Sequence, residues 1–557
     1  MKNILAKSET LLIVITVMVI YCIQYYHWNG GYTDPDDYMH ALRTIDFINT
    51  PTLFEHKFML TDYPFGEVLH WTRLFDIIMT LCILPFYFSE PLQTAVFYGG
   101  LLLTPLFFLL TLICVEKWGK TELDINGRIF LYLLLIFNPD LSHTYTLAHP
   151  DHHALILFLA AAQILWLNKF INDKQLKQII ISAVICGLSL WLAAEGIFLY
   201  TAELMFLYCR YLFFSSDKKI LSTFTLSYAL TICVFWLINP PYQGWSYIDN
   251  GRISVFYVII AFYVWIALEI TGKICRTKIL QTSFLAFAAV ILIAAFYYAG
   301  LLDNPFNESI KIAFTSRISE LKSGFNFRLM AFPMIAFFCL YGLLQNKYEN
   351  GKILMFAIFL IVYTGLTVYA RRFCGYSVLY TMSIIMLRLK YLHLKNLTYC
   401  GIIILLIALN PLAYYFDDLI SNEEERNNKI NFDVNILNYI NFPQGAVVSD
   451  IFISPYILWY SERPTVASPY HRNIEGITDN HEILFSNNEQ KVKELLIKHQ
   501  VKAIILPIAD ESNTYYNAPS RNCDKLYGQI MACNTRYPWL KKVYRNESLA
   551  IFAVHLE

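Results

Sequence analysis

Charge is what this sequence lacks most. Only 15% of its 557 residues are Asp, Glu, Lys or Arg, whereas an average soluble domain carries about a quarter. The 43 basic residues balance the 43 acidic ones, so there is none of the basic excess that nucleic-acid-binding proteins use to neutralise phosphates. With 56% hydrophobic residues and a mean hydropathy of +0.43, the composition predicts a membrane protein without a nucleic-acid partner.

The motifs of several familiar chemistries are also absent. The chain has no phosphate-binding Gly-rich loop and no Gly-x-Ser-x-Gly nucleophile motif. Its 12 cysteines include no Cys-x-x-Cys pair and no Cys/His zinc spacing. Most of them lie in apolar runs, which is typical of small buried side chains. Cys523 and Cys533 differ because they lie in a polar C-terminal region, and whether they form a disulfide stays open.

Long hydrophobic runs are abundant. The first, Leu11 to Tyr26, follows Lys2 and Lys7, and no small-x-small cleavage site comes after it. We therefore expect a retained first span with a cytoplasmic N-terminus. Further runs of membrane-crossing length bring the expected total to about thirteen; they lie at about 91–115, 128–147, 153–170, 177–194, 196–214, 220–238, 253–272, 279–299, 329–345, 352–370, 373–389 and 397–416.

The charge of the connecting loops gives the expected orientation. Basic residues gather in alternate loops, and cytoplasmic loops are the ones enriched in Lys and Arg. An odd number of spans puts the two ends of the chain on opposite sides of the membrane. The basic loops contain Lys117 and Lys120, Lys169–Lys177, Lys218 and Lys219, Lys273–Lys278, Lys347–Lys352 and Arg388–Lys395.

Two external loops are too long and too polar to be simple connectors. Residues 29–75 form a large first loop rich in His, Asp, Trp and Tyr, and a second loop covers 300–328. We assign both to an α-helical polytopic membrane domain that covers residues 1–416.

The composition changes for good from about Asp417. A polar linker at 421–431 is followed by strand-like apolar runs at 446–449 and 503–506, with an amphipathic helical pattern between them. We expect residues 417–557 to form a soluble α/β domain on the periplasmic side.

Asp34-Pro35-Asp36-Asp37 opens the first external loop. Three carboxylates in four positions repel one another unless a cation or a basic partner offsets them, and close carboxylates are good ligands for Mg²⁺ or Mn²⁺. A solvated turn explains the pattern equally well. Arg43 and Asp46 follow at helical spacing, so we expect a helix with an acidic first turn to begin at the motif.

Two further acidic motifs are expected on the same side of the membrane. Asp151-His152-His153 begins the fourth span. A cap for that helix explains Asp151 but not the histidines, and a charge at the bilayer edge is costly enough to indicate a function. Ser316–Glu320 lies in the second external loop, where Glu320 alone resembles an ordinary loop acid. Together these carboxylates and imidazoles form a candidate site for a divalent cation.

Two arginines and one more acid lie at the same membrane edge. Arg371 and Arg372 stand on the side that disfavours positive charge. Snorkelling to the interface explains them, and so does bidentate binding of a phosphate at the membrane surface. Glu195 interrupts an apolar stretch at an external turn and is a further candidate.

The order and sidedness of these motifs resemble the GT-C glycosyltransferases, and most closely the catalytic subunits of oligosaccharyltransferases, over nearly the whole chain. Those enzymes take a glycan from a polyprenyl or dolichyl phosphate carrier, with a divalent metal held by acids of their external loops. The residues that resemble the family's motifs are Asp36 with Asp37 in the first loop, Asp151-x-His153 in the second motif, Ser316–Glu320 in the fifth external-loop motif with one extra residue, and Arg372-Phe373 in the pair that grips the carrier phosphate.

The resemblance breaks at one motif. The family's Trp-Trp-Asp, which recognises the hydroxyl residue of an Asn-x-Ser/Thr acceptor, is matched only by Val448-Ser449-Asp450. The missing tryptophans imply an acceptor other than that sequon. His471 and Arg472, in the polar stretch Ser468–Asn473, are candidates for acceptor binding beside Asp450, although a structured loop explains the stretch as well.

The resemblance implies an enzyme of a bacterial-type inner membrane that transfers a sugar or oligosaccharide from a polyprenyl-(di)phosphate carrier to a glycan, lipid or protein acceptor in the periplasm. A transporter or flippase of lipid-linked glycans is one alternative, which the apolar spans disfavour. A non-catalytic assembly subunit is another, which would not need the whole acidic set. The implied roles are Mg²⁺ or Mn²⁺ binding by Asp36, Asp151, His153 and Glu320, phosphate binding by Arg372 and Arg371, and base catalysis by Asp36 or Asp37.

Overall fold

The computed structural model describes residues 2–214, 218–275, 277–298, 321–325, 327–346, 348–392, 443–508, 525–531, 536–546 and 549–556, together with residues 401 and 437. The chain divides into two compact units. The first comprises the described parts of Met1–Gly31, Trp71–Asp303 and Ser319–Ile420, and the second those of Tyr32–His70, Asn304–Ile318 and Ser421–Glu557.

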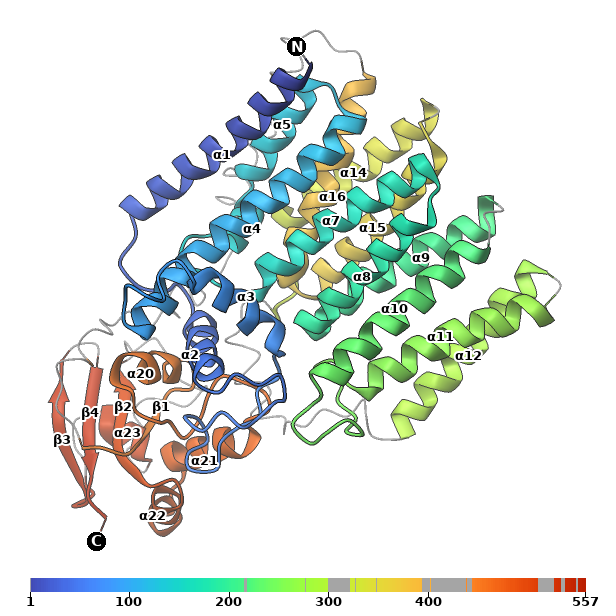
Figure 1. The fold of residues 1–557 in the computed structure, drawn as a ribbon. Helices are drawn as coiled ribbons and strands as arrows, with labels where there is room; N and C mark the ends of the chain where they lie inside the picture. Colours follow the sequence, from blue (N-terminus) through green and yellow to red (C-terminus); the bar gives the residue numbers. More distant parts are fainter. Residues whose placement is uncertain are drawn as a thin grey trace. The chain divides into compact units, whose positions relative to one another are not determined.

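The first unit is a bundle of helices that run alongside one another (Figure 1). In this bundle α7 packs against α4 and α8, and α10 packs against α8 and α11. The elements are α1 (Lys2–Tyr26), α3 (Arg73–Ile83), α4 (Leu92–Glu122), α5 (Ile125–Ile136), α6 (Pro139–Thr144), α7 (His152–Asp173), α8 (Leu176–Leu192), the 3₁₀ turn η1 (Ala194–Gly196), α9 (Ile197–Phe214), α10 (Lys218–Ile238), α11 (Val255–Ile274), α12 (Lys278–Tyr298), α14 (Phe327–Gln345), α15 (Asn350–Tyr369), the 3₁₀ turn η3 (Arg371–Phe373) and α16 (Cys374–Tyr391).

The apolar character of these helices confirms the predicted polytopic α-helical membrane fold. Among the described residues, 8 helices are long and apolar enough to cross a membrane, and α5, α8 and most of α14 are shorter apolar helices. In α7, 78% of the most apolar stretch is buried inside the bundle, whereas in α12 only 11% is. The apolar surface of α12 therefore faces outward, as expected for a helix in contact with lipid.

Each predicted span up to residue 389 coincides with helical structure, with one correction. The predicted span at 128–147 is two helices, α5 and α6, because the chain is interrupted at Asn138-Pro139. The Asn138 side chain accepts hydrogen bonds from the backbone N–H groups of Asp140 and Leu141 and so caps α6. Pro139 occupies the first turn of α6, where its missing N–H costs nothing. The predicted span at 397–416 lies outside the described residues.

The spans are also less uniformly apolar than expected. Glu203 of α9 is completely buried inside the bundle. Its Oε2 accepts a hydrogen bond of 2.6 Å from the Ser182 hydroxyl of α8 and one of 2.8 Å from the Gln163 amide of α7. These polar side chains are joined by hydrogen bonds across three helices, which lowers the free-energy cost of placing them in the bilayer.

Basic residues from two of the loops predicted to be cytoplasmic meet at the end of α4. The Glu122 carboxylate lies 2.6 Å from Lys352 Nζ and accepts a 2.7 Å hydrogen bond from the Tyr348 hydroxyl. The Glu122 carbonyl accepts a 2.5 Å hydrogen bond from Lys390 Nζ. These contacts bring both basic segments to one end of the bundle.

The second unit contains the predicted α/β fold. Its four-stranded sheet has the order β1-β2-β4-β3; β1 and β2 are parallel, and the other pairs are antiparallel. The observed β1, β2 and α22 confirm the strands and the helix expected from the sequence. The elements are α2 (Pro35–Asn49), β1 (Ala446–Ser449), α20 (Ser454–Ser461), α21 (Ile474–Phe485), α22 (Glu489–Lys498), β2 (Val501–Pro507), α23 (Leu526–Met531), β3 (Leu540–Arg545) and β4 (Leu549–Val554).

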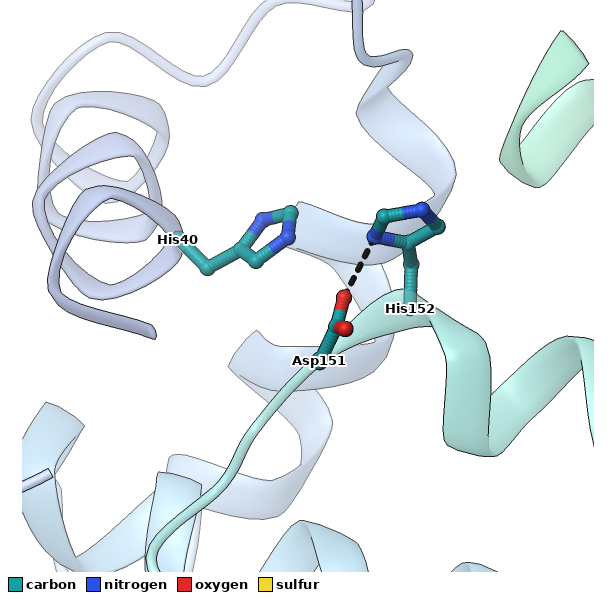
Figure 2. A group of neighbouring side chains, drawn as sticks. All are labelled: His40, Asp151 and His152. Atoms are coloured by element: carbon teal, nitrogen blue, oxygen red, sulfur yellow. Dashed lines mark ion pairs between the residues drawn. The ribbon is translucent and has the colours of Figure 1, made fainter. Parts of the chain in front are cut away.

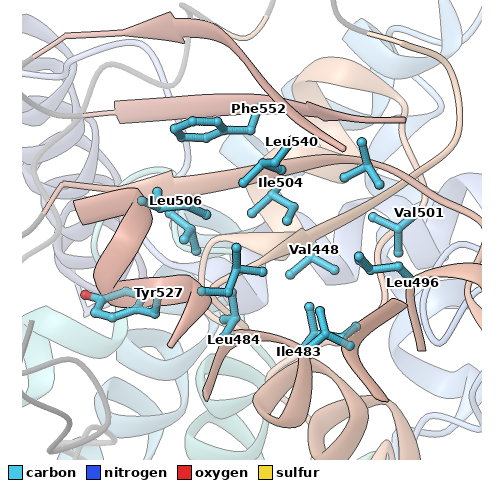
Figure 3. Packing of buried hydrophobic residues seen from close by; sticks show 14 of the residues in the cluster. Val448, Ile483, Leu484, Leu496, Val501, Ile504, Leu506, Tyr527, Leu540 and Phe552 are labelled. Carbon is cyan, nitrogen blue, oxygen red and sulfur yellow. The ribbon is translucent and has the colours of Figure 1, made fainter. Parts of the chain in front are cut away.

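Side chains alternate between the two faces of this sheet, and both faces are largely buried along β1, β2 and β4, whereas most of β3 is exposed or half-buried. Val448 and Ile504 lie in a hydrophobic cluster with residues of α21, α22 and α23 (Figure 3). Their neighbours Val447 and Ile505 lie in a second cluster with residues of α20. The expected boundary at 416/417, the linker at 421–431, Cys523 and Cys533 all lie outside the described residues.

Part of the first external loop also belongs to the second unit. Residues Tyr32–His70 group with this unit, and the backbone explains why. The Thr465 N–H donates to the Leu60 carbonyl at 2.8 Å, and the Tyr63 N–H donates to the Thr465 carbonyl at 3.2 Å. These bonds tie the loop to the segment that follows α20.

Candidate active site

Asp151 stands at the N-cap of α7 without capping it. Within the described residues its side chain makes no capping hydrogen bond to the helix. Instead Asp151 Oδ1 lies 2.5 Å from His152 Nδ1 (Figure 2), and Asp151 Oδ2 lies 3.7 Å from His153 Nε2. The Asp151 side chain is only 6% exposed, so these contacts form away from bulk water.

A tight turn before α7 gives Asp151 this direction. Ala148 has a φ of 63°, in the left-handed region that a residue with a Cβ rarely adopts. The Asp151 N–H donates to the His149 carbonyl at 2.8 Å, and the same carbonyl accepts a 3.0 Å hydrogen bond from the Thr104 hydroxyl of α4. Strain and hydrogen bonds in this turn are typical of a functional site.

Glu195 reaches the same histidines from η1, the turn between α8 and α9. Its Oε1 lies 2.7 Å from His153 Nδ1 and 3.9 Å from His152 Nε2. The turn lies directly against α8, because a Cβ on Gly196 would stand 2.1 Å from the Ser189 backbone carbonyl. Only glycine allows that approach, so the residue after Glu195 fixes where the carboxylate lies.

Arg372 joins the cluster from η3, the turn between α15 and α16. Its Nε lies 3.5 Å from Glu195 Oε2, and its Nη2 lies 3.4 Å from His153 Nε2. Phe373 anchors the turn by edge-to-face contact with Phe198 of α9, with ring centroids 5.2 Å apart. The Arg372 side chain is 29% exposed, so part of it is accessible from outside.

Arg371 has a different task. Its Nε donates to the Ser323 carbonyl at 3.3 Å, and its backbone N–H donates to the Lys322 carbonyl at 3.0 Å. Arg371 therefore ties down the segment before α14, and the geometry favours Arg372 as the arginine for an anionic ligand.

The residues at this cluster fit a divalent cation. His152, His153 and Glu195 each offer one ligand atom, and these atoms all lie within 4.8 Å of one another. Imidazoles and carboxylates together suit Mn²⁺ and Zn²⁺, whereas Mg²⁺ prefers oxygen ligands alone. The donor set therefore points to the transition metals more than to Mg²⁺.

The first acidic motif begins α2 in the second unit. Asp34 caps the helix by accepting from the Asp36 N–H at 3.0 Å. Asp37 is completely buried, and its Oδ2 accepts from the Asp34 N–H at 2.9 Å and the Thr33 hydroxyl at 3.0 Å. This reciprocal arrangement is a capping box. Asp36 Oδ1 accepts a 2.9 Å hydrogen bond from the Tyr470 hydroxyl.

The candidate acceptor residues lie in the same unit. Asp450 follows β1, is fully buried, and accepts a 2.8 Å hydrogen bond from the Phe452 N–H, so its carboxylate helps to shape a turn. His471 and Arg472 are half-buried and follow Tyr470 directly. The His471 ring packs near His70, with centroids 4.8 Å apart.

The structure thus brings together three predicted site residues, Asp151, His153 and Arg372. It adds His152 and Glu195, which the predicted metal set did not include. The signal for Glu195 was present, because it is the acid that interrupts an apolar stretch. Asp36 and Asp37 lie on α2 of the second unit, and Glu320 lies outside the described residues.

Comparison with known proteins identifies the fold. No family model matches the chain, and no curated protein matches it by sequence. The solved structure of archaeal oligosaccharyltransferase AglB from Archaeoglobus fulgidus, in complex with an inhibitory peptide and a dolichol-phosphate, is similar with a TM-score of 0.68 and 13% identity. That match covers 93% of this chain and 72% of AglB.

The same fold similarity extends to the Archaeoglobus fulgidus oligosaccharyltransferase in complex with Zn and sulfate. Its TM-score is 0.63 at 14% identity, covering 98% of this chain and 73% of that one. The resemblance to oligosaccharyltransferases that the motif order predicted is confirmed at the level of the fold. At such low identity the fold alone carries over.

Proposed function

We propose that this chain is a membrane glycosyltransferase. It transfers a sugar or an oligosaccharide from a polyprenyl-phosphate or polyprenyl-diphosphate carrier to an acceptor on the external face of the membrane. The observation that carries the proposal is the cluster of Asp151, His153, Glu195 and Arg372, in which His153 and Glu195 lie within 4 Å of a partly exposed arginine. The fold similarity to AglB, which has been solved with dolichol-phosphate, supports the same class of donor.

Arg372 is the residue for the donor phosphate. In the transfer, an acceptor atom bonds to the anomeric carbon, the bond from that carbon to the phosphate oxygen breaks, and the electron pair stays on the phosphate. A guanidinium binds phosphate oxygens in a bidentate manner, so its attraction grows as negative charge develops there. Phe198 and Phe373 hold the arginine turn in place.

The acidic motifs supply the remaining roles. Asp151 and His153, with Asp36 and Glu320 as predicted further members, would hold a divalent cation, whose bound charge offsets that of the departing phosphate. Asp36 takes the proton that the acceptor loses. The geometry favours Asp36 over Asp37 as this base, because Asp37 is completely buried and its Oδ2 accepts hydrogen bonds from the Asp34 N–H and the Thr33 hydroxyl.

The site belongs on the periplasmic face of an inner membrane, with the N-terminus in the cytoplasm. Two observations support this orientation. Segments rich in basic residues converge on Glu122, and Asn168 of α7 donates to Glu122 at 3.0 Å. The histidines lie at the other end of α7, about 24 Å away at 1.5 Å per residue, which is most of a bilayer core.

The acceptor is a glycan, a lipid or a protein site other than Asn-x-Ser/Thr. Val448 and Ser449 stand where the family motif has its two tryptophans, so the motif itself supplies no indole donor next to Asp450. His471 and Arg472 are more accessible than the buried Asp450, so they are the residues for acceptor contacts. A site that cannot satisfy a Thr hydroxyl discriminates poorly between Thr and Ala.

The proposal is tested with purified protein in bilayer nanodiscs that contain a polyprenyl-diphosphate-linked sugar. The expected result is consumption of the donor, release of the polyprenyl diphosphate and appearance of the sugar on a candidate acceptor, followed by mass spectrometry. In liposomes, movement of intact donor between leaflets without consumption would identify a flippase. An unchanged donor on both sides would indicate an assembly subunit.

A further inference from the structure

The Nδ1 atom of the His153 ring lies next to a carboxylate. His153 Nδ1 lies 2.7 Å from Glu195 Oε1, within normal hydrogen-bond length. The two atoms are not aligned for a hydrogen bond in this structure, but a carboxylate can only accept unless it is protonated, so its closeness favours the imidazole proton on Nδ1. The lone pair of the neutral ring then lies on Nε2.

The other contacts of His153 agree with this assignment of the proton. Nε2 faces Arg372 Nη2 at 3.4 Å and Asp151 Oδ2 at 3.7 Å. A guanidinium group donates and never accepts, so a proton on Nε2 would point towards another donor. With the proton on Nδ1, the Nε2 lone pair faces Asp151 Oδ2. These two atoms are then both available as ligands for one cation.

We infer that Glu195 is a positioning residue that orients His153 for metal binding. The inference rests on the proposed function, because it presumes that Asp151 and His153 hold the metal. Metal-binding histidines generally donate their second ring N–H to a carboxylate or carbonyl, which fixes the tautomer and raises the basicity of the ligand nitrogen. Glu195 Oε1 lies 2.7 Å from His153 Nδ1 and is therefore within reach of that role.

The fold holds Glu195 in this place independently of any ligand. The η1 turn cannot move towards α8, because Gly196 is already against the Ser189 backbone. The Ser189 hydroxyl also donates to the Gly196 carbonyl at 2.9 Å. Glu195 Oε2 lies 3.5 Å from Arg372 Nε. One carboxylate therefore orients both the imidazole and the arginine proposed to hold the donor phosphate.

The test is Mn²⁺ binding to the full chain in nanodiscs without donor, measured by titration calorimetry and by electron spin resonance. Glu195→Ala is expected to weaken Mn²⁺ binding about 10- to 100-fold. Glu195→Gln keeps an oxygen that accepts from Nδ1–H, so it is expected to lose less than about tenfold. The nitrogen coupling of an imidazole on Mn²⁺ should persist in wild type and Gln, and weaken in Ala.

Glu203→Gln is the matched control, since it changes a buried acid on the helix that follows η1 and should leave Mn²⁺ affinity unchanged. Wild-type affinity in Glu195→Ala would overturn the inference. Equal losses in Gln and Ala would also overturn it, because they would make Glu195 a direct ligand. Absence of Mn²⁺ binding in the wild type would instead refute the metal part of the proposed function. If Glu195→Ala fails to fold, the Gln variant and its nitrogen coupling decide.

Discussion

Two helices of this protein begin with an aspartate beside a proline, and they use that aspartate in opposite ways. At α2, Asp34 and Asp37 satisfy each other's backbone N–H groups in a capping box. At α7, Asp151 occupies the N-cap position, but its oxygens lie against His152 and His153. Asp34 and Asp37 stabilise the start of α2, whereas Asp151 gathers possible metal ligands at the start of α7.

This contrast shows how an acidic motif at a membrane surface can be interpreted. Charge density alone predicted a metal site at both places. What separates them is whether backbone N–H groups already occupy the carboxylate oxygens. Within the Asp34–Asp37 motif, Asp36 Oδ1 accepts a hydrogen bond from the Tyr470 hydroxyl rather than from a backbone N–H of the helix start.

The largest expected effect is that of Asp151→Asn. It keeps the shape of the side chain and removes the charge that would hold the cation. Loss of about 4 kcal/mol of stabilisation corresponds to a roughly 10³-fold drop in transfer rate, with little change in melting temperature. Asp173→Asn, at the far end of the same helix, is the control and should retain activity. Transfer at nearly the wild-type rate by Asp151→Asn would contradict the view that the aspartate at the start of α7 binds a metal while those at the start of α2 cap a helix.

Arg372→Ala comes next. A charge-assisted hydrogen bond contributes about 1.5–3 kcal/mol, so the donor KM should rise about 10- to 150-fold. Arg372→Lys should recover only part, because lysine lacks the planar fork. Arg371→Ala should affect the donor KM much less, since its guanidinium bonds the Ser323 carbonyl. An unchanged KM in Arg372→Ala would leave interfacial snorkelling as the explanation of this arginine.

Asp34→Ala tests the capping role proposed for the start of α2. Removal of an N-cap costs about 0.5–2 kcal/mol, so the free energy of unfolding of the second unit should fall by that amount. Chemical denaturation followed by the fluorescence of Trp459 and Trp539, both in that unit, measures it. A stability equal to that of the wild type would show that the capping box contributes nothing.

An effect of a different kind is expected from pH, through Glu67 in the second unit. Burial raises the pKa of the Glu67 carboxyl to about 8 from an ordinary value of 4.5, although a hydrogen bond from Ser468 opposes the shift. The folded protein thus binds a proton that the unfolded chain releases, so the contribution of Glu67 to stability is largest below about pH 4.5 and is lost as the pH rises through about 8. Glu67→Gln should flatten the melting temperature between pH 5 and 9. An identical pH profile for wild type and variant would contradict this.

Much of the fold follows from the sequence, because each span is a local apolar run. The break at Asn138-Pro139 was also in the sequence, as a capping residue followed by a proline. What the sequence could not give was the surroundings of Glu203. Its partners come from α7 and α8, and only the packing of three helices brings them together.

The candidate site also has a part that could be predicted from the sequence and a part that could not. Asp151-x-His153 was predictable, since both residues belong to one helix start. The contact of His153 with Glu195 was not, because it depends on η1 lying against α8 at Gly196. Likewise, no local pattern distinguishes Arg371 from Arg372, and only their contacts with Ser323 and Glu195 separate them.

The most direct test of the central claim is metal dependence of transfer in the wild type and in Asp151→Asn, assayed side by side with a polyprenyl-linked donor. After chelation with EDTA, transfer by the wild type should stop, and Mn²⁺ should restore it. The same addition should leave Asp151→Asn inactive. Full wild-type transfer in EDTA would contradict the account, because Asp151 and His153 would then act without a metal.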